Sequence, residues 1–486
     1  MTTKLPVPAL GPPIEKFGKS KEWITLSDRT FWCLLVFLFV CTCAKHVLTF
    51  STGPTMLVDD AKEYWERGVR VSEGDLMQLQ NAVNYRGPLY PTFLGICQWC
   101  FGRDALFAVI LLQHSMHMAT GMIVAAMTWV ICRNRILVFF AYGMSVLSVT
   151  GPWYSNVVLT ESFFQLIMTA TFGALVIYHL RPTALGAGLL GLFLGMAILT
   201  RPIPKLLWIP LFLLFFAHSY NLFTRRRKNF RRIAVQVAVA CMAMFCVMAP
   251  WSIRNWFVFQ NAAVAKVPSI NKWVVCFHDQ SAADLPIPIT DSGYQLRRYL
   301  PEIDQDSSLR RDGYEVIRRL QRAGLSDTQI DELVNTICLE AIYNNPRVFF
   351  WKTVKRFVNF WRCPVNPYPY YSKYSSDREV DFDNQMIWRF EPIASWYEWI
   401  LKRSPSLQLR WMELDSIAGF LGTALLIVRR QTRIIGISLA TIFLYFAGVT
   451  ASLEVESYRY RLVLDPCIQV AIACGLFGGQ IRLRSE

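Results

Sequence analysis

Apolar residues gather into long runs that alternate with short polar stretches along most of the chain. Each run has about 20 residues, the length that an α-helix needs to cross a hydrocarbon core of roughly 30 Å. Ten such runs predict membrane spans at 31–51, 105–132, 135–152, 160–180, 183–200, 203–220, 231–251, 413–429, 434–452 and 459–480. The pattern predicts an all-α polytopic membrane protein.

The charge of the chain follows from this topology. Of the 486 residues, 53% are hydrophobic and 17% are charged, and the formal net charge is +15. Arg and Lys cluster in the short loops between alternate spans, which is typical of loops that face the cytoplasm. If the N-terminus is cytoplasmic, all of these clusters fall on the cytoplasmic side. We therefore attribute the positive charge to topology and expect no nucleic-acid partner.

One apolar segment, 89–101, is too short to be a clear span. It has about a dozen residues, a length more typical of a re-entrant or interfacial element. Counting it as a crossing would place most of the later basic clusters outside. We therefore expect it to lie at the outer membrane surface, within a first external loop that covers 51–104. A short tilted helix that crosses the membrane is the alternative.

The longest polar region, 252–412, is expected to be an external and mostly helical insert. An amphipathic pattern predicts a helix over 312–323 that ends at Gly324. Ser326 with Gln329 forms a capping-box signature for a second helix, which stops near the Asn-Asn-Pro sequence that follows.

Two further features of the insert bear on its surroundings. In the segment 346–362 aromatic and basic residues alternate. This predicts an interfacial helix with its rings in the acyl boundary and its cations at the lipid headgroups. Cys276 and Cys363 also lie in the insert, and their spacing does not decide whether they pair.

The chain is thus expected to have four parts. They are a cytoplasmic tail at 1–30, a transmembrane region at 31–251, the external insert at 252–412, and C-terminal transmembrane helices at 413–486. The tail shows no signal-peptide pattern, so the first span is expected to be an uncleaved anchor.

Ionisable and polar residues at the ends of the spans gather on the external side in this topology. They are Asp59, Asp60, Tyr64, Arg86, Glu161, Arg201, Trp251, Arg254, His278, Glu454, Glu456, Tyr458 and Arg459. Ionisable groups at membrane depth are costly unless they face a cavity or a partner, so they indicate a functional site. Purely structural roles are the alternatives. Asp59 and Asp60 are suited to cap a helix, Arg201 is suited to snorkel at a span end, and Glu161 is suited to complement a helix dipole.

Several of these segments resemble the GT-C superfamily of integral-membrane glycosyltransferases. The likeness is to the bacterial members similar to protein O-mannosyltransferases (the dolichyl-phosphate-mannose-protein mannosyltransferase family) and to the aminoarabinose transferases that modify lipid A. The family's Asp with an aromatic residue four positions later fits Asp60 and Tyr64, and its basic-residue-then-Pro-Leu-Tyr segment fits the sequence that starts at Arg86. The segments LTES, LTRP, PWSIRNW and RYRLVLDP also resemble stretches common in this family. Asp59 before and Ala61 after the Asp depart from the family pattern, which leaves open which carboxylate is the base.

The resemblance implies a GT-C-like transmembrane helix bundle and an inverting transfer of sugar from a polyprenyl-phosphate donor. Asp60 would be the general base, with Asp59 as the alternative. Arg86, Arg201 and Arg459 would bind the donor phosphate, Glu161 would hold sugar or acceptor hydroxyls, and Tyr64 would shape the pocket. Carboxylates such as Asp59, Asp60 and Glu161 are also suited to ligate Mg²⁺ or Mn²⁺, and the sequence does not decide whether a metal is needed.

The expected partners are the lipid donor, the surrounding membrane lipids, and an acceptor that is protein, lipid or glycan. The expected location is a bacterial inner membrane with the site on the periplasmic face. Two other functions stay open at this point. A secondary transporter would also need many spans and intramembrane charge, but we find neither internal repeats nor broken helices near the midplane. A polymerase or ligase of lipid-linked polysaccharide would also use external Arg and Glu.

Overall fold

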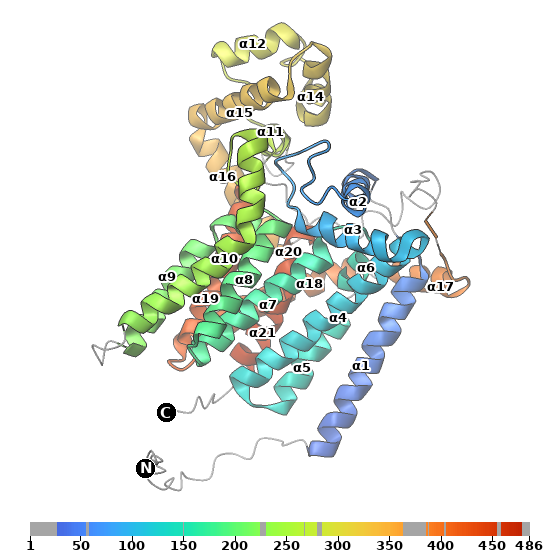
Figure 1. The fold of residues 1–486 in the computed structure, drawn as a ribbon, viewed down its shortest axis with the longest axis vertical. Helices are drawn as coiled ribbons and strands as arrows, with labels where there is room; N and C mark the ends of the chain where they lie inside the picture. Colours follow the sequence, from blue (N-terminus) through green and yellow to red (C-terminus); the bar gives the residue numbers. More distant parts are fainter. Residues whose placement is uncertain are drawn as a thin grey trace, which may run out of the picture.

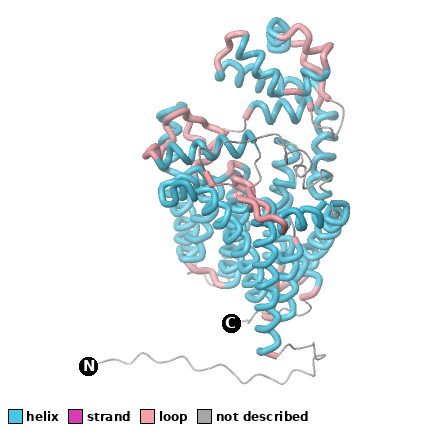
Figure 2. The backbone as a smooth tube through the Cα atoms, turned by 90° about the vertical axis from the view of Figure 1, so that its right-hand side faces the viewer, coloured by secondary structure: helices cyan, strands magenta, loops and turns pink. Residues whose placement is uncertain are grey.

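The computed structural model describes most of the chain. The described residues are 27–54, 58–148, 150–223, 230–266, 268–278, 284–362, 385–386, 388–402, 405–453 and 458–478. Within them every regular element is helical, so the prediction of an all-α protein is confirmed (Figure 2). The N-terminal tail expected at 1–30 lies almost entirely outside the described residues.

A bundle of long helices forms one end of the molecule. Its members are α1 (Asp28–Ser51), α4 (Ala105–Cys132), α5 (Arg135–Leu147), α7 (Glu161–Leu180), α8 (Ala184–Thr200), α9 (Trp208–Phe223), α10 (Phe230–Phe259), α18 (Pro405–Val428) and α19 (Arg433–Leu453). Five described stretches are long and apolar enough to cross a membrane, namely α1, the continuous stretch of α3 and α4, α7, α10 and α19. The chain is therefore a polytopic membrane protein. The other expected spans fall wholly or partly on further helices, namely α5, α8, α9, α18 and the last helical segment of the chain.

The bundle is held together by close helix contacts that its small residues permit. A Cβ atom at Gly191 of α8 would lie 2.0 Å from the carbonyl oxygen of Ala240 on α10. Any larger residue there would force the two helices apart. Such close approach is a common source of helix association in membranes, where apolar side chains gain little by leaving lipid.

Figure 1 shows α2 (Val58–Ser72) and α3 (Leu89–Phe101) lying across one end of this bundle. The chain turns from α3 into α4 through the short helix η1 (Gly102–Asp104), where Gly102 adopts a positive φ of 54°. A side chain at this φ would be strained, so glycine suits the turn. The loop between α4 and α5, which carries Arg133 and Arg135, lies at the opposite end of the bundle, as expected for a cytoplasmic loop.

The helices of the insert are α11 (Ser269–Phe277), α12 (Asp291–Tyr299), α13 (Ser307–Arg311), α14 (Gly313–Arg322), α15 (Asp327–Asn344), α16 (Pro346–Arg362) and α17 (Ile393–Lys402). Most of the insert, α11 to α15, stacks above the end of the bundle that carries α2 and α3, whereas α16 leads down to the bundle and α17 lies beside the end of α1 (Figure 1). The two helices predicted from the amphipathic pattern and the capping box are confirmed as α14 and α15. Ser326 and Gln329 form both hydrogen bonds of the capping box.

Two expectations about local structure are wrong. The first is the span at 135–152, which is interrupted: α5 ends at Leu147, Ser148 has an extended backbone, and the short helix α6 (Thr150–Ser155) follows. By contrast, the last expected span is helical without a break over 458–476, through α20 (Tyr458–Arg461), η4 (Leu462–Leu464), α21 (Asp465–Ala471) and a π-helical segment (Ile472–Leu476).

The second correction concerns the cations of α16. Lys352 and Arg356 are fully buried instead of facing lipid headgroups. Lys352 donates to the carbonyl oxygen of Cys276 at 3.0 Å, and Arg356 donates to that of Ala451 at 2.6 Å. Lys352 thus joins two helices of the insert and Arg356 joins the insert to α19, while Trp351 of the same helix is exposed. The position of α16 at a membrane interface stays a prediction.

Candidate active site

The helix α2 presents one polar stripe toward the end of the bundle. The stripe consists of Asp60, Glu63, Tyr64 and Arg67. Glu63 and Tyr64 lie three and four residues after Asp60, and Arg67 lies four after Glu63, so the four side chains share one helix face. The acidic residues stand near the start of the helix, where the helix dipole favours negative charge. Arg67 donates to Glu63 at 3.2 Å and fixes its carboxylate within the helix.

Arg86 reaches this stripe from the segment between α2 and α3. Its Nη2 donates to Oδ1 of Asp60 and also to Oε2 of Glu63, the latter at 3.0 Å. Its Nη1 donates to the hydroxyl of Tyr64 at 3.2 Å, and the guanidinium stands 4.8 Å from the centre of that ring. One arginine therefore gathers three polar side chains of α2.

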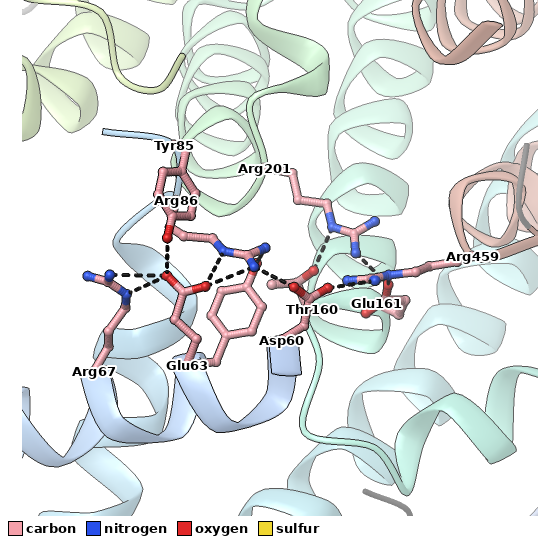
Figure 3. A network of polar contacts seen from close by, with 10 residues as sticks. Asp60, Glu63, Arg67, Tyr85, Arg86, Thr160, Glu161, Arg201 and Arg459 are labelled. Atoms are coloured by element: carbon pink, nitrogen blue, oxygen red, sulfur yellow. Dashed lines mark hydrogen bonds and ion pairs between the residues drawn. The ribbon is translucent and has the colours of Figure 1, made fainter. Parts of the chain in front are cut away.

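Arg459 joins α2 to the transmembrane bundle. It lies on α20, and its Nη1 donates to Oδ2 of Asp60 at 2.8 Å. Its Nε donates to Oε1 of Glu161, the first residue of α7. Each oxygen of Asp60 is thus bound to a different arginine, and the two arginines come from segments far apart in the sequence (Figure 3).

The buried end of the network contains Glu161 and Arg201. Arg201 follows the last residue of α8, and its Nη2 donates to Oε1 of Glu161 while its Nε donates to the hydroxyl of Thr160 at 2.5 Å. The side chain of Glu161 is 1% exposed. Its second oxygen, Oε2, has no hydrogen-bond partner within the described residues.

The network has an open end and a closed end. The side chain of Asp60 is 33% exposed and those of Arg86 and Arg459 are each 20% exposed, in contrast to Glu161. Among the described residues, the network drawn in Figure 3 pairs four arginines (67, 86, 201 and 459) with three carboxylates (60, 63 and 161). These described side chains carry one positive charge in excess, which favours an anionic ligand, whereas the side chains of Asp59, Glu454 and Glu456 lie outside the described residues.

The electrostatic state of Asp60 follows from its partners. Burial by itself raises the pKa of this carboxyl, but the charges of Arg459 and Arg86 together outweigh it and hold the pKa well below its ordinary value. Tyr85 shows the opposite shift, because burial and the neighbouring Glu63 raise its pKa to about 12. Asp60 is therefore ionised at neutral pH, and Tyr85 is neutral.

The arrangement does not fit a divalent metal ion. No group of three or more His, Cys, Asp or Glu side chains in the described part of the chain is placed to hold one. The oxygens of Asp60 that would bind it are taken by two guanidinium groups, and a cation placed there would be repelled by both. Asp60 and Glu161, two of the three carboxylates suited to Mg²⁺ or Mn²⁺, are thus held by arginines, and the side chain of the third, Asp59, lies outside the described residues.

The structure brings six of the seven residues proposed from the sequence into one network, namely Asp60, Tyr64, Arg86, Glu161, Arg201 and Arg459. The backbone of Asp59 belongs to α2, but its side chain lies outside the described residues. Glu63 was missed. The signal was present, since Glu63 lies three residues after Asp60 and four before Arg67, a spacing that places all three on one helix face.

Glu63 offers a first test of the network. Replacing Glu63 with Gln removes an anion that holds Arg86, so we expect the KM for an anionic substrate to rise by about 10- to 100-fold, the equivalent of one charged hydrogen bond, with kcat little changed. Steady-state kinetics will check this. Glu66→Gln is the matched control, because Glu66 is on the same helix and pairs with Lys62 only at 3.8 Å in solvent. An equal effect of both changes would contradict a specific role of Glu63.

No family model matches the chain, and no curated protein sequence matches it. Three solved structures are similar to it. The archaeal oligosaccharyltransferase AglB from Archaeoglobus fulgidus, in complex with an inhibitory peptide and a dolichol-phosphate, has 9% identity and a TM-score of 0.45 over 92% of this chain and 50% of its own. The chain therefore spans about half the length of that protein.

The other two structures are of ArnT from Cupriavidus metallidurans. The form bound to undecaprenyl phosphate has 13% identity and a TM-score of 0.34, over 89% of this chain and 77% of its own. The apo form has 14% identity and a TM-score of 0.33, over 90% of this chain and 78% of its own. The functional argument for this chain therefore rests on its own site.

Proposed function

We propose that this chain is an inverting membrane glycosyltransferase of the GT-C type that moves a sugar from a polyprenyl-phosphate donor to an acceptor hydroxyl. One observation carries the proposal: a partly exposed carboxylate, Asp60, is held between Arg86 and Arg459 at the open end of a network with excess positive charge. A carboxylate beside two guanidinium groups combines a base with a phosphate-binding pair, which is what this transfer requires.

The donor phosphate would bind Arg86 and Arg459. A guanidinium group binds phosphate oxygens through two parallel hydrogen bonds. The phosphodiester of the donor carries one negative charge, which matches the single excess positive charge of the network. When the sugar leaves, the lipid phosphate gains negative charge, and fixed arginines stabilise this charge as it develops.

Phosphate binding would also free the base. In the structure each oxygen of Asp60 accepts from an arginine, and these two charges hold its pKa well below the ordinary value, so the carboxylate is a weak base in this state. A phosphate that takes over these arginines releases Asp60 beside the sugar. Asp60 then accepts the proton of the acceptor hydroxyl, whose oxygen forms the new bond to the anomeric carbon while the bond from that carbon to the phosphate oxygen breaks.

Glu161 and Tyr64 complete the site in this proposal. The free Oε2 of Glu161 is suited to accept a hydrogen bond from a sugar or acceptor hydroxyl, because a buried oxygen without a partner is unfavourable. Tyr64 is 3% exposed and packs edge-on against Tyr90 at 5.2 Å, so it forms a rigid wall. Arg201 binds Glu161 and Thr160 and is assigned to fixing Glu161 in place.

The position of the network argues against the transporter hypothesis. Glu161 begins α7 and Arg201 follows α8, so the network lies at the ends of the helices. A transporter that alternates access would place its site near the middle of the membrane. We propose that this end faces the periplasm of a bacterial inner membrane, because the arginine-rich loop after α4 lies at the opposite end. The sugar stays open, as does the acceptor among protein, lipid and glycan.

Sugar release from radiolabelled polyprenyl-phosphate sugars by the purified protein in nanodiscs tests the proposal. We expect turnover with at least one donor of a panel that covers hexoses and pentoses. An absence of turnover with the whole panel, together with no binding of undecaprenyl phosphate, would overturn the proposal and favour transport.

Chelation gives a second prediction. Because Arg86 and Arg459 would neutralise the donor phosphate in this proposal, the role that a metal ion would otherwise have, we expect turnover in EDTA to equal turnover with added Mg²⁺ or Mn²⁺. Initial rates measured with and without EDTA will check this. A loss of activity in EDTA that added Mn²⁺ restores would contradict the expectation and point to a metal at Asp59 and Asp60.

The depressed pKa of Asp60 gives a prediction for pH dependence. The profile of kcat/KM reports the free enzyme, in which Asp60 stays ionised well below the ordinary pKa of about 3.9. We therefore expect kcat/KM to stay level between pH 7 and about 4 as far as Asp60 is concerned. The profile of kcat reports the donor complex, in which the phosphate has taken the arginines and the pKa of Asp60 is higher, so its acid limb should lie at higher pH. Coincident acid limbs would contradict release of the base by the phosphate.

The lowered pKa of Asp60 also makes the free energy of unfolding depend on pH. The ion pairs of Asp60 stabilise the fold fully above its unfolded pKa of about 3.9, and this stabilisation is lost as the pH falls through the lower folded pKa.

A further inference from the structure

The segment that carries Arg86 has no regular secondary structure of its own. This segment, residues 73–88 between α2 and α3, is called the arm here. Two of its residues, Gln78 and Asn81, have positive φ angles of 50° and 49°. Residues other than glycine rarely adopt such backbone angles. The arm therefore needs contacts from outside to keep one conformation.

Arg254, near the end of α10, supplies such contacts. Its guanidinium donates three hydrogen bonds to carbonyl oxygens of the arm: Nε to Met77 at 3.0 Å, Nη2 to Gln78 at 2.6 Å and Nη1 to Val83 at 3.2 Å. The residue is 5% exposed. A planar guanidinium can bind three carbonyls at once, whereas a lysine ammonium acts as a single point charge.

Neighbouring contacts fix Arg254 itself and extend the hold toward Arg86. Its guanidinium stacks over the ring of Trp251 at 4.5 Å and donates to Asn255 Oδ1 at 2.7 Å. Beyond α10, the backbone N–H of Lys266 donates to the carbonyl oxygen of Asn84 at 2.7 Å, two residues before Arg86. The end of α10 and the chain after it thus hold both halves of the arm.

We infer that Arg254 is a positioning residue for donor binding: it holds the arm so that Arg86 faces Asp60. This inference rests on the proposed function, because it takes Arg86 to be a phosphate ligand. It assigns a role to the PWSIRNW segment, which carries both Trp251 and Arg254. Within the described residues the hydrogen bonds of Arg254 go to the arm and to Asn255, and none goes to a side chain of the network in Figure 3; its charge is also near enough to that of Arg67 for the two to repel each other.

Binding of undecaprenyl phosphate to the purified protein in detergent tests the inference. We expect Arg254→Met to weaken binding by about 10- to 100-fold, since small displacements of a binding group have effects of this size. Arg254→Lys should recover only part of the loss. Arg429→Met is the matched control, because Arg429 also donates to backbone carbonyls, those of Cys474 and Gly478, but far from the arm. Its variant should bind like the wild type even if its thermal stability falls.

A double-mutant cycle separates positioning from a general structural role. In a background of Arg86→Gln, the change Arg254→Met should weaken binding by little more than Arg86→Gln alone, because the group that it positions is already gone. Equal effects in both backgrounds would overturn the inference. If the wild type fails to bind undecaprenyl phosphate, the proposed function falls too, whereas equal binding by wild type and Arg254→Met overturns the inference alone.

A separate observation concerns two cysteines in the core of the insert. Cys276 on α11 and Cys338 on α15 are both fully buried, and the Cys276 Sγ atom lies 3.9 Å from the Cys338 carbonyl oxygen. Within the described part of the insert they are the only cysteines. Their thiols also interact directly, which lowers the pKa of Cys276 and raises that of Cys338. Cys363, considered above as a partner for Cys276, lies outside the described residues.

We propose that Cys276 and Cys338 are joined by a disulfide when the insert faces an oxidising compartment. The thiolate of Cys276 would attack a disulfide oxidant, either a protein or a small molecule, and release one thiol. The thiolate of Cys338 would then attack the mixed disulfide and release the second. The two cysteines lose two protons and two electrons, and the oxidant becomes two thiols. Because both residues are buried, this oxidation belongs to the folding of the insert.

Alkylation of the denatured protein with N-ethylmaleimide, before and after reduction, tests the disulfide by peptide mass mapping. We expect Cys276 and Cys338 to be unmodified before reduction and modified after it. Cys467, a buried cysteine of α21, should be modified in both samples and serves as the control. In the Cys276→Ser variant, Cys338 should be modified without reduction. Modification of both cysteines in the unreduced wild type would overturn the proposal.

Discussion

Replacing Asp60 with Asn is expected to slow sugar transfer by about 100- to 10,000-fold, the usual contribution of a positioned general base. The same change should tighten the binding of undecaprenyl phosphate by about tenfold, or 1.4 kcal/mol. The opposite signs follow from one feature: Asp60 occupies the two arginines, 86 and 459, that would bind the phosphate. An asparagine holds them less strongly and so competes less with the ligand.

Asp59→Asn is the matched control for this prediction. It removes one negative charge from the adjacent residue of the same helix, and we expect it to retain most of the activity. Single-turnover rates with a labelled donor and equilibrium binding of undecaprenyl phosphate measure the two effects separately. If activity is lost in Asp59→Asn and survives in Asp60→Asn, the base assignment is wrong. If Asp60→Asn slows sugar transfer and also weakens the binding of undecaprenyl phosphate, the phosphate does not compete with Asp60 for the arginines.

Hydrophobic pattern predicted most of the fold, because a helix must present enough apolar residues to cross a membrane. It failed where the chain leaves the helix within an apolar run. The run at 135–152 is apolar enough for one helix, yet α5 ends at Leu147 and Ser148 has an extended backbone. Pattern also could not place Lys352 and Arg356, because their carbonyl partners, such as those of Cys276 and Ala451, are distant in the sequence.

The candidate site shows the same division between local and distant information. Asp60, Arg86 and Glu161 stood out in the sequence because charges at span ends are costly without partners. Their pairing could not be read there, since Arg459 is nearly 400 residues from Asp60 and contacts both Asp60 and Glu161. The ion-paired state of Asp60 is a product of that tertiary contact. It changes the mechanism, because a base held by two arginines must first be released.

Glu161→Gln is expected to have the largest effect on stability. Glu161 is 1% exposed and is bound by Arg201 and Arg459, so its replacement leaves two guanidinium groups facing a neutral amide. Removing one partner of a buried ion pair costs about 3–5 kcal/mol. Thermal unfolding in detergent should show a clear fall in the transition temperature. Glu66→Gln, which removes an exposed carboxylate of α2, should leave it within the scatter of the wild type.

The double variant Glu161→Gln with Arg201→Met separates the energy of the buried pair from the loss of a side chain. Arg201 is 8% exposed and loses its main anion in the single variant, so removing its charge as well should recover much of the lost stability. Activity should not recover, because the oxygen assigned to the sugar or acceptor hydroxyl is still missing. If the double variant loses as much stability as the two single variants together, Glu161 and Arg201 do not stabilise the fold through their mutual interaction. Arg459 and Asp60 would then hold this end of the bundle without it.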